Sequence, residues 1–392
     1  MLVVISDLHL VDGTAGGNNL PLEAFKEVFL CDIKSLAQDN NAKEIKIVLL
    51  GDTIDLLRTA KWFDGNFPLE DRPWGENGLN DLNKVRLQKG CTANLKSSKT
   101  EQRCKEILRD IIETNHGTFE FFKKIKHNFD PLPPKKIELI YVPGNHDRLI
   151  NYYPSLRKKI VQVLDPTIDE ITAVGDLNSK CNWRFRNSYA SEKYGILARH
   201  GHKFDKWNYA GSCRQVPMGD VITTEIVGRI PSLFRREMEN KINAMAAFIS
   251  PYEKSRIEAT LDAEIAVLTE EIDNIRPLTS IFLYLRRKSG KFKKLEGHGN
   301  DYSEALNCTL CKVLRDFWRI PFVKKWLWQP RNLRTVGNGL IEVAREWAAS
   351  RRGLIPDPSR DRFSKDAQRD YNKSNKDKKI PFILYGHTHS PL

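Results

Sequence analysis

Five short motifs rich in aspartate, histidine and glycine recur along this chain, and four of them directly follow an apolar run of strand type. They contain six of the nine histidines. In order, the motifs are Asp7-Leu8-His9, Gly51-Asp52-Thr53-Ile54-Asp55, Gly144-Asn145-His146-Asp147, His200-Gly201-His202 and Gly386-His387-Thr388-His389. Imidazoles and carboxylates at strand ends are suitable ligands for divalent cations. The chain must therefore fold so that several strands deliver these side chains to one place, which predicts a metal site.

Apolar runs and helical spacing alternate along the chain, which predicts an α/β fold with sheets covered by helices. Residues 21–38 have apolar side chains at three- and four-residue intervals, the spacing of a helix. A hairpin over residues 183–198 is expected to lead into His200. The runs of strand type are residues 3–5, 45–50, 137–142 and 380–385.

The spacing of the motifs divides the chain into three parts. We expect residues 1–203 to form the first part of a core, with an irregular insert at 59–100 near the mouth of the site. Residues 204–379 are expected to form a basic, mainly helical insertion, and residues 380–392 to complete the core. Within the insertion, helical spacing covers residues 232–249, 253–273, 303–318 and 337–350, and the charge-rich residues 365–379 are predicted to be a mobile tether.

The insertion carries most of the positive charge. Residues 203–379 hold 34 Lys and Arg against 23 Asp and Glu, which accounts for +11 of the net charge of +13. Such a field raises the local concentration of anionic partners. The seven cysteines follow no disulfide spacing, which favours reduced thiols and a cytoplasmic setting. No run approaches the roughly 18 apolar residues of a transmembrane helix, and the N-terminus lacks the features of a signal peptide.

The five motifs, in this order, resemble those of the calcineurin-like metallophosphoesterase superfamily, which reads Asp-x-His, Gly-Asp, Gly-Asn-His-Asp/Glu, His and Gly-His-x-His. The resemblance covers residues 1–205 and 380–390 and leaves the insertion without a counterpart. It implies a four-layer α/β/β/α sandwich. The family usually continues with further strands after the fifth motif, whereas this chain ends at Leu392. We therefore expect a truncated form, or a sheet that is closed by other means.

The resemblance also implies two divalent metal ions, about 3.5–4 Å apart. Manganese is expected, with iron, zinc or nickel as alternatives. All the implied ligands belong to the five motifs. One ion would be held by Asp7, His9 and His389 and the other by Asn145, His200 and His387, with Asp52 bridging both.

The activity that the resemblance implies is hydrolysis of phosphate mono- or diesters by a hydroxide that bridges the two metals. His146 would protonate or stabilise the leaving oxygen, and Asp147 would orient His146 or a neighbour. Arg148 is predicted to bind a substrate phosphate. Asp55 is expected to support a ligand histidine, and His202 is interpreted as a bystander. Two alternatives stay open: a nuclease acting on DNA or RNA, and a non-catalytic binding scaffold.

Substrate choice is expected to depend on the insertion. Residues 315–334 interleave basic and aromatic side chains, which suits single-stranded nucleic acid and, nearly as well, an anionic lipid surface. A third interpretation is an aromatic stripe in the core with a solvated basic face. The basic run at 286–294 is predicted to be an exposed loop or hairpin that faces an anion. Cys308 and Cys311 are interpreted as one face of a helix rather than half of a zinc site.

Overall fold

A parallel three-stranded sheet lies at the centre of the computed structural model. Its strands are β1 (Leu2–Ile5), β2 (Glu44–Leu50) and β3 (Lys136–Val142), in the order β1–β2–β3. In the middle strand, Val48 pairs with Val4 on one side and with Ile140 on the other. Because the strands are parallel, their carboxyl ends meet at one edge of the sheet. The structure describes residues 1–79, 98–125, 136–178, 183–205, 207–211, 215–273, 281–294, 297–327, 358–374 and 381–386.

Both faces of this sheet are buried. Successive side chains of a strand point to opposite faces. In β2, Ile45, Ile47 and Leu49 belong to a large apolar cluster that also contains helix residues, whereas Val48 and Leu50 belong to a second cluster on the other face. A continuous apolar run is typical of a strand that is buried on both sides. The run at residues 45–50 therefore predicted the strand that is observed as β2.

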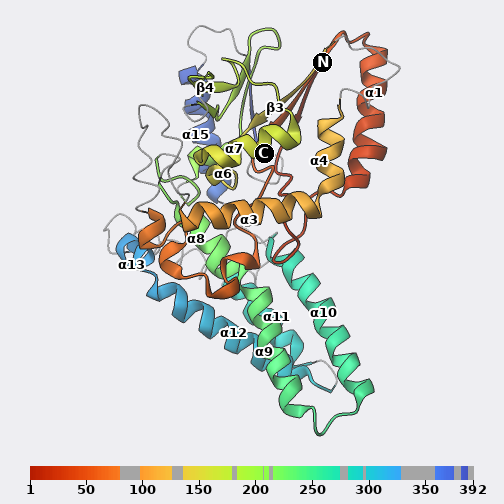
Figure 1. The fold of residues 1–392 in the computed structure, drawn as a ribbon, viewed down its shortest axis with the longest axis vertical. Helices are drawn as coiled ribbons and strands as arrows, with labels where there is room; N and C mark the ends of the chain where they lie inside the picture. Colours follow the sequence, from red (N-terminus) through yellow and green to blue (C-terminus); the bar gives the residue numbers. More distant parts are fainter. Residues whose placement is uncertain are drawn as a thin grey trace.

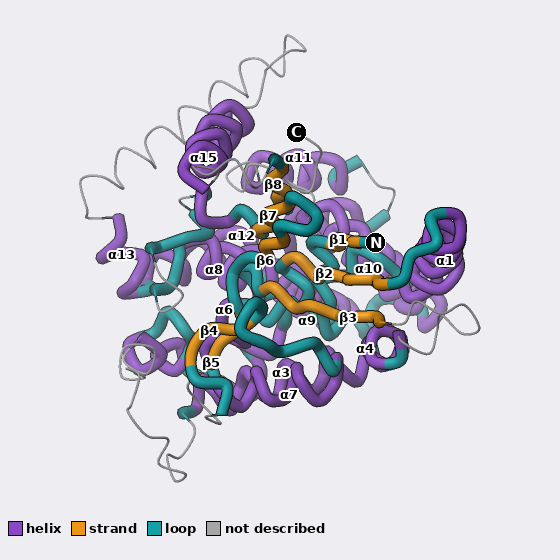
Figure 2. Tube along the Cα trace, turned by 90° about the horizontal axis from the view of Figure 1, so that it is seen from above, coloured by secondary structure: helices purple, strands orange, loops and turns teal. Residues whose placement is uncertain are grey.

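A second sheet faces the first. It consists of β6 (Tyr189–Ser191), β7 (Ile196–Arg199) and β8 (Phe382–Tyr385), with β6 antiparallel and β8 parallel to β7. Tyr189 and Ala198 pack in the same cluster as Val48, so the two sheets contact each other, as Figure 2 shows. The hairpin expected over residues 183–198 is confirmed only for β6 and β7. The strand β5 (Trp183–Phe185) pairs instead with β4 (Ala173–Gly175).

Helices connect the strands of the first sheet and cover its other face. The helix expected at 21–38 is present as the π-helical η1 (Ala24–Phe29) followed by α1 (Leu30–Asp39). The helix α3 (Lys99–Thr114) is capped by Ser98, whose hydroxyl accepts a hydrogen bond from the backbone N–H of Glu101 (3.1 Å). The remaining elements are the short 3-10 turns η2 (Ala60–Trp62), η3 (Asp64–Asn66) and η4 (Leu69–Asp71), and the helices α4 (His116–Lys123), α6 (Arg148–Tyr152) and α7 (Pro154–Leu164).

The helix α15 (Pro358–Ser374) lies beside the second sheet. Its Asp370 pairs with Arg199 of β7 and accepts a hydrogen bond from the Tyr385 hydroxyl of β8 (2.9 Å). The mobile tether predicted for residues 365–379 is therefore wrong for residues 365–374, which are helical. Residues 375–379 lie outside the described part of the chain.

The insertion is mainly helical, and Figure 1 shows α9 to α12 projecting away from the sheets. The helices expected at 232–249, 253–273 and 303–318 are confirmed, whereas residues 337–350 are not described. The loop predicted at 286–294 is wrong, because most of these residues belong to α11. The elements are α8 (Met218–Ile222), the π-helical η6 (Thr223–Gly228), α9 (Ile230–Met245), α10 (Pro251–Asp273), α11 (Ile281–Phe292), α12 (Gly299–Arg319) and α13 (Pro321–Leu327).

The start of the insertion is packed into the core. Ile226 and Phe234 belong to the same apolar cluster as Ile47 of the central sheet. The side chains of Arg72 and Trp74, from the stretch between β2 and β3, both donate hydrogen bonds to Glu225 Oε1 (2.5 and 2.8 Å). Among the described helices, none combines the length and the apolar character that crossing a bilayer requires.

Candidate metal centre

The first two motifs lie on neighbouring loops that leave the same edge of the central sheet. The backbone N–H groups of Asp7 and His9 donate to the carbonyl oxygens of Gly51 (3.1 Å) and Asp52 (2.8 Å) and hold the loops together. Asp7, His9 and Asp52 have positive φ angles of 59°, 46° and 47°. This conformation is uncommon for residues other than glycine and is found most often at functional sites. Three of the five non-glycine residues with positive φ in the described part of the chain are thus candidate metal ligands.

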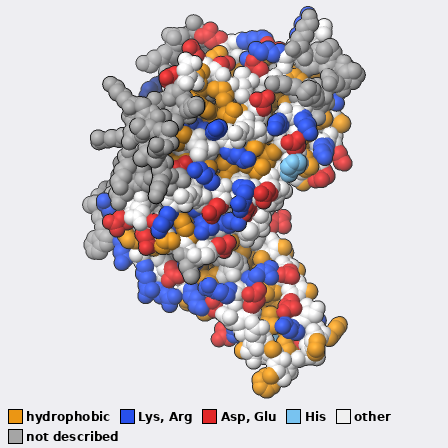
Figure 3. All heavy atoms as spheres, in the orientation of Figure 1, with side chains coloured by type: hydrophobic (Ala, Val, Ile, Leu, Met, Phe, Trp, Pro, Cys, Tyr) orange, Lys and Arg blue, Asp and Glu red, His pale blue; other side chains and the backbone are white. Residues whose placement is uncertain are grey.

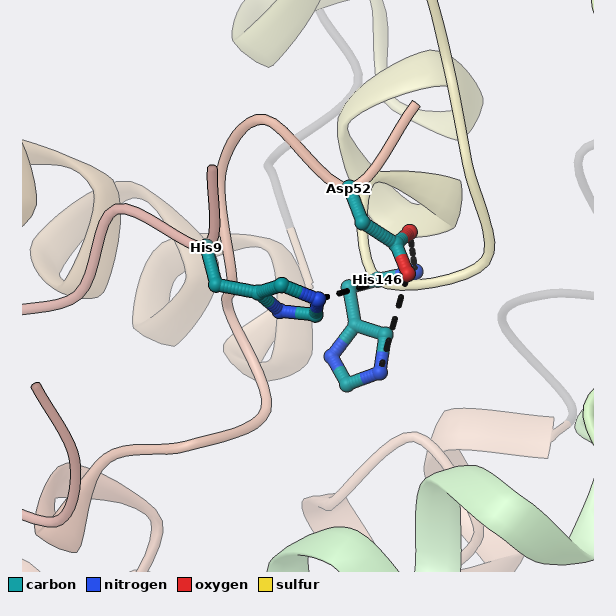
Figure 4. A group of neighbouring side chains, drawn as sticks. All are labelled: His9, Asp52 and His146. Carbon is teal, nitrogen blue, oxygen red and sulfur yellow. Dashed lines mark hydrogen bonds and ion pairs between the residues drawn. The ribbon is translucent and has the colours of Figure 1, made fainter. Parts of the chain in front are cut away.

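The carboxylate of Asp52 is shared by two groups of donor atoms. Donor atoms of His9, Asp52 and His146 lie within 4.8 Å of one another, and so do those of Asp7, Asp52 and His200. Its Oδ2 lies 2.9 Å from His200 Nε2, 3.8 Å from His9 Nε2 and 3.9 Å from His146 Nε2. Figure 4 shows the imidazoles of His9 and His146 beside this carboxylate. An oxygen placed among imidazole nitrogens in this way can serve two cations.

One further predicted ligand, Asn145, completes the described part of the site. The amide Oδ1 of Asn145 lies 3.1 Å from His200 Nε2, while His200 Nδ1 lies 3.2 Å from the carbonyl oxygen of Leu50. A backbone contact of this kind fixes the orientation of a ligand imidazole. Asp7 Oδ1 lies 3.9 Å from His9 Nε2 and 4.0 Å from His200 Nδ1. Asp7 is therefore about as close to His200 as to His9. The resemblance, by contrast, assigns Asp7 and His9 to the same metal ion.

The glycines of the motifs make room for side chains of other motifs. A Cβ atom at Gly51 would overlap the ring of His200, and a Cβ atom at Gly144 would overlap the carboxylate of Asp52. Gly51 also has a φ of 82°, which side chains disfavour. The glycines of the second and third motifs are therefore required by the close packing of the candidate ligands.

The fifth motif is described only at its glycine. Gly386 follows β8, and a Cβ atom there would overlap Ser6 and lie 2.8 Å from Asp7 Oδ2. The other two predicted ligands, His387 and His389, lie outside the described residues. The structure thus brings together five of the seven predicted ligands, Asp7, His9, Asp52, Asn145 and His200.

Asp55 holds two of the imidazoles in place. Its Oδ2 lies 3.1 Å from His9 Nδ1 and 2.7 Å from His146 Nδ1, and accepts a hydrogen bond from Arg58 Nε (2.7 Å). Because both Nδ1 atoms face Asp55, both Nε2 atoms face Asp52. The contact expected between Asp55 and a ligand histidine is present. Its contacts with His146 and Arg58 were not predicted, although Arg58 follows Asp55 at a spacing of three residues.

Asp147 acts on the backbone rather than on the ring of His146. Its carboxylate ties the loop after β3 to the loop after β2, while Asp55 contacts the His146 imidazole. Asp147 therefore orients the backbone of neighbouring residues and not the imidazole of His146. Its carboxylate accepts hydrogen bonds from the backbone N–H groups of Gly144 (2.9 Å), Thr53 (3.2 Å) and Ile54 (2.9 Å).

Burial and close contacts between carboxylates and imidazoles shift the pKa values of the site. Burial lowers the pKa of His9 to about 4, which leaves its imidazole neutral at pH 7. Burial also acts to lower the pKa of His146 and of His200, but nearby carboxylates, chiefly Asp55 and Asp52 respectively, raise each pKa to about 9. Burial acts to raise the pKa of Asp52, yet the adjacent imidazoles hold it well below its usual value. Ionised carboxylates of this kind attract cations.

Arg148, the predicted phosphate ligand, has a partner in the insertion. Its guanidinium is buried and donates hydrogen bonds from Nε (3.1 Å) and Nη2 (2.6 Å) to Asp220 Oδ2 of α8. This pairing offsets the charge that would attract a phosphate. Binding of phosphate by Arg148 therefore stays a prediction. The contact with Asp220 could not be found from the sequence, because 72 residues separate the partners.

A small pocket of about 40 Å³ lies beside the candidate ligands. Asn145, Arg148 and His202 contribute to its wall, together with Tyr209 from the start of the insertion. The ring of His202 lies 5.4 Å from that of His200 and 5.8 Å from that of Tyr209, measured between centroids. His202, which we interpreted as a bystander, therefore lines the space next to the site.

Comparisons of the chain with protein-family models, with curated proteins and with solved structures return no match. The chemistry of the site is therefore judged from its own donor atoms. Two carboxylates, an amide oxygen and three imidazoles converge at a buried point among the described residues. Mixed nitrogen and oxygen donors of this kind suit divalent transition metals, so the residues present fit a metal site.

Proposed function

We propose that this chain is a two-metal phosphoesterase of the calcineurin-like metallophosphoesterase type, acting on phosphate mono- or diesters. The observation that carries the proposal is the position of the Asp52 carboxylate, shared by two groups of buried or half-buried donor residues. A pair of cations about 3.5–4 Å apart is typical of enzymes that catalyse displacement at phosphorus. A single carboxylate between two ligand groups is suited to hold such a pair.

The order of the layers supports the proposal. Helices pack on one face of the β1–β3 sheet, and the β6–β8 sheet packs on the other. On β6–β8, Arg199 and Tyr385 contact α15. This succession is consistent with the α/β/β/α sandwich that the resemblance implies.

We assign the seven predicted ligands to two divalent cations, for which manganese is the first choice and iron, zinc or nickel are alternatives. When bound, such cations lower the pKa of a coordinated water and polarise the phosphoryl group. Asp52 would serve both cations, His9 would hold one, and Asn145 and His200 would hold the other, while Asp7 lies near both groups. We propose that His387 and His389 complete the two sets.

The remaining residues position the substrate and move a proton. Asp55 holds Nδ1 of His146, so the Nε2 of this ring is directed toward the centre. We assign to His146 Nε2 the donation of a proton to the leaving oxygen of the ester. Asp147 keeps the loop that carries His146 in register with the loop of Asp52. The pocket beside Asn145 is assigned to the substrate.

The test is turnover by protein of known metal content. Protein loaded with Mn²⁺ is assayed with p-nitrophenyl phosphate and bis(p-nitrophenyl) phosphate, and bound metal is measured by plasma mass spectrometry. We expect two metals per chain, hydrolysis of at least one ester, and loss of hydrolysis on chelation. A chain that holds two metals but hydrolyses neither of these esters, nor an alkyl ester, would support the binding scaffold instead. Hydrolysis that survives complete removal of metal would also overturn the proposal.

A further inference from the structure

The end of α12 and the start of α13 present a basic surface that the proposed chemistry does not use. We define the basic surface as the exposed side chains Arg315, Trp318, Arg319, Lys324 and Lys325. Figure 3 shows Lys and Arg side chains gathered in the region where Figure 1 places the end of α12. Arg315, Trp318 and Arg319 have the three- and four-residue spacing of one face of α12, and Lys324 and Lys325 follow in α13.

Most of these charges are not neutralised by acidic neighbours. Among the described residues, Arg319, Lys324 and Lys325 form no ion pair, whereas Arg315 contacts Asp316. Several other lysines of the insertion are paired: Lys312 lies 2.7 Å from Glu237 and Lys241 lies 2.7 Å from Glu304. Part of the excess positive charge of the insertion therefore lies on this surface without an acidic partner among the described residues.

The apolar side of the same helices is already covered. Phe317, Ile320 and Val323 are buried in the main cluster. Trp318 is 49% exposed, and among the described residues of α12 and α13 it is the most exposed of the large apolar side chains. A helix that binds a bilayer needs a continuous exposed apolar face, which these two helices do not have in the described part of the chain. A single aromatic ring between arginines is instead suited to stacking on a nucleic acid base.

The basic surface is connected to the metal site through two tryptophans. The ring of Trp326 in α13 lies 5.4 Å from the ring of Trp207, measured between centroids. The residues that follow Trp207, Asn208 and Tyr209, line the pocket beside Asn145. The end of α13 therefore lies against the segment whose next residues line the pocket beside the proposed catalytic site.

We propose that the basic surface binds single-stranded nucleic acid, with Lys324, Lys325 and Arg319 on phosphates and Trp318 stacked on an unpaired base. The inference rests on the proposed function for its consequence, since the bound strand would supply the phosphodiester that the metal site cleaves. Binding itself does not require the metals, so it is tested separately.

The experiment measures binding of fluorescent 20-nucleotide oligodeoxythymidine and oligouridine to the full chain by anisotropy, in EDTA, from 50 to 200 mM salt. We expect Lys324→Glu/Lys325→Glu to weaken binding by about tenfold or more and to reduce the salt slope by about 1.4, because two phosphate contacts are lost. Trp318→Ala should weaken binding about tenfold with an unchanged slope, because stacking is lost. Circular dichroism checks that each variant is folded.

The matched control is Lys293→Glu/Lys294→Glu, which makes the same charge change on two exposed lysines. These residues follow Phe292, whose ring lies 5.8 Å from that of Tyr302 near the start of α12. The 21 residues of α12 span about 30 Å, so the control lies far from the basic surface. The control should bind like the original chain, and an equal loss in both double variants would overturn the proposal.

Two more results would overturn it. One is no oligonucleotide binding at 50 mM salt. The other is a Lys324→Glu/Lys325→Glu variant that keeps oligonucleotide binding and loses binding to phosphatidylcholine–phosphatidylglycerol vesicles, which would assign the surface to lipid. If binding behaves as expected but no ester is hydrolysed, the proposed function fails and the binding surface stands. If the chain both binds oligonucleotides and hydrolyses esters, Lys324→Glu/Lys325→Glu should retain hydrolysis of p-nitrophenyl esters. It should lose hydrolysis of oligonucleotides.

Discussion

At the scale of single residues, one carboxylate connects the whole candidate site. Asp52 is almost fully buried, contacts His200 at 2.9 Å, and accepts a hydrogen bond from the backbone N–H of His146 at 2.8 Å. A buried carboxylate needs positive partners to remain ionised. In the protein without metal, the imidazoles supply part of that positive charge. Bound cations would supply the rest.

Asp52→Asn removes the charge and keeps the shape of this side chain. We expect it to abolish hydrolysis and to weaken binding of both metals, because the amide is a poor bridge between two cations. Metal content per chain, measured beside turnover, checks this result. Asp176→Asn, which removes an exposed carboxylate, serves as the control and should change neither. Full occupancy by two metals in Asp52→Asn would contradict the bridging role.

His146→Ala should separate proton donation from metal binding. We expect kcat to fall by about 10²- to 10⁴-fold, the range for loss of a general acid, while metal content is unchanged. The loss should be larger for an alkyl phosphate ester than for a nitrophenyl ester, because only the alkoxide leaving group needs the proton. The measurement is kcat for both ester types. Loss of metal, or an equal loss for both esters, would show that His146 has another role.

At the scale of elements, a buried ion pair joins the third motif to the insertion. Arg148 begins α6, and Asp220 lies in α8 and is 1% exposed. Removing one partner of a buried pair leaves an uncompensated charge, which is costly, whereas replacing both by apolar groups is often neutral. The position of α8 against α6 thus depends on both side chains.

Asp220→Ala is therefore expected to lower the free energy of unfolding by about 3–5 kcal/mol. Urea denaturation followed by circular dichroism measures the change. Arg148→Met/Asp220→Leu should recover most of the stability, because no charge remains buried. A cost below about 1 kcal/mol for Asp220→Ala would mean that water or another group already compensates Arg148.

The strands β1, β2, β3 and β8 were predictable because each is a local apolar run, whereas α11 and α15 were interpreted as a loop and a tether because charged residues dominate their sequences. In α11, the buried Ile281, Leu285 and Phe292 follow helical spacing, but the basic residues among them suggested a loop. In α15 the helix is polar, and its contacts come from Asp370 to Arg199 and Tyr385 on distant strands. Partners that distant in sequence leave no local signal.

At the scale of the whole molecule, the insertion and the core share their interior. The sequence indicated where the insertion begins but not that it is packed into the core. Val221, Ile226 and Leu233 belong to one apolar cluster with Leu49 and Ile107. The motifs predicted the candidate ligands because sheet geometry brings strand ends together. No comparable rule predicts which part of the core an inserted helix packs against.

A shared interior predicts that the molecule unfolds as one unit. We expect a single calorimetric transition, with equal calorimetric and van't Hoff enthalpies, because exposing the insertion would also open the main apolar cluster. Free Mn²⁺ at about 100 times its dissociation constant should add about 2.7 kcal/mol of stability per site. Mn²⁺ should raise the midpoint temperature of the single transition as a whole. Asp52→Asn should remove this increase. Two transitions, of which Mn²⁺ moves only one, would show that the insertion is thermodynamically separate from the metal-binding core.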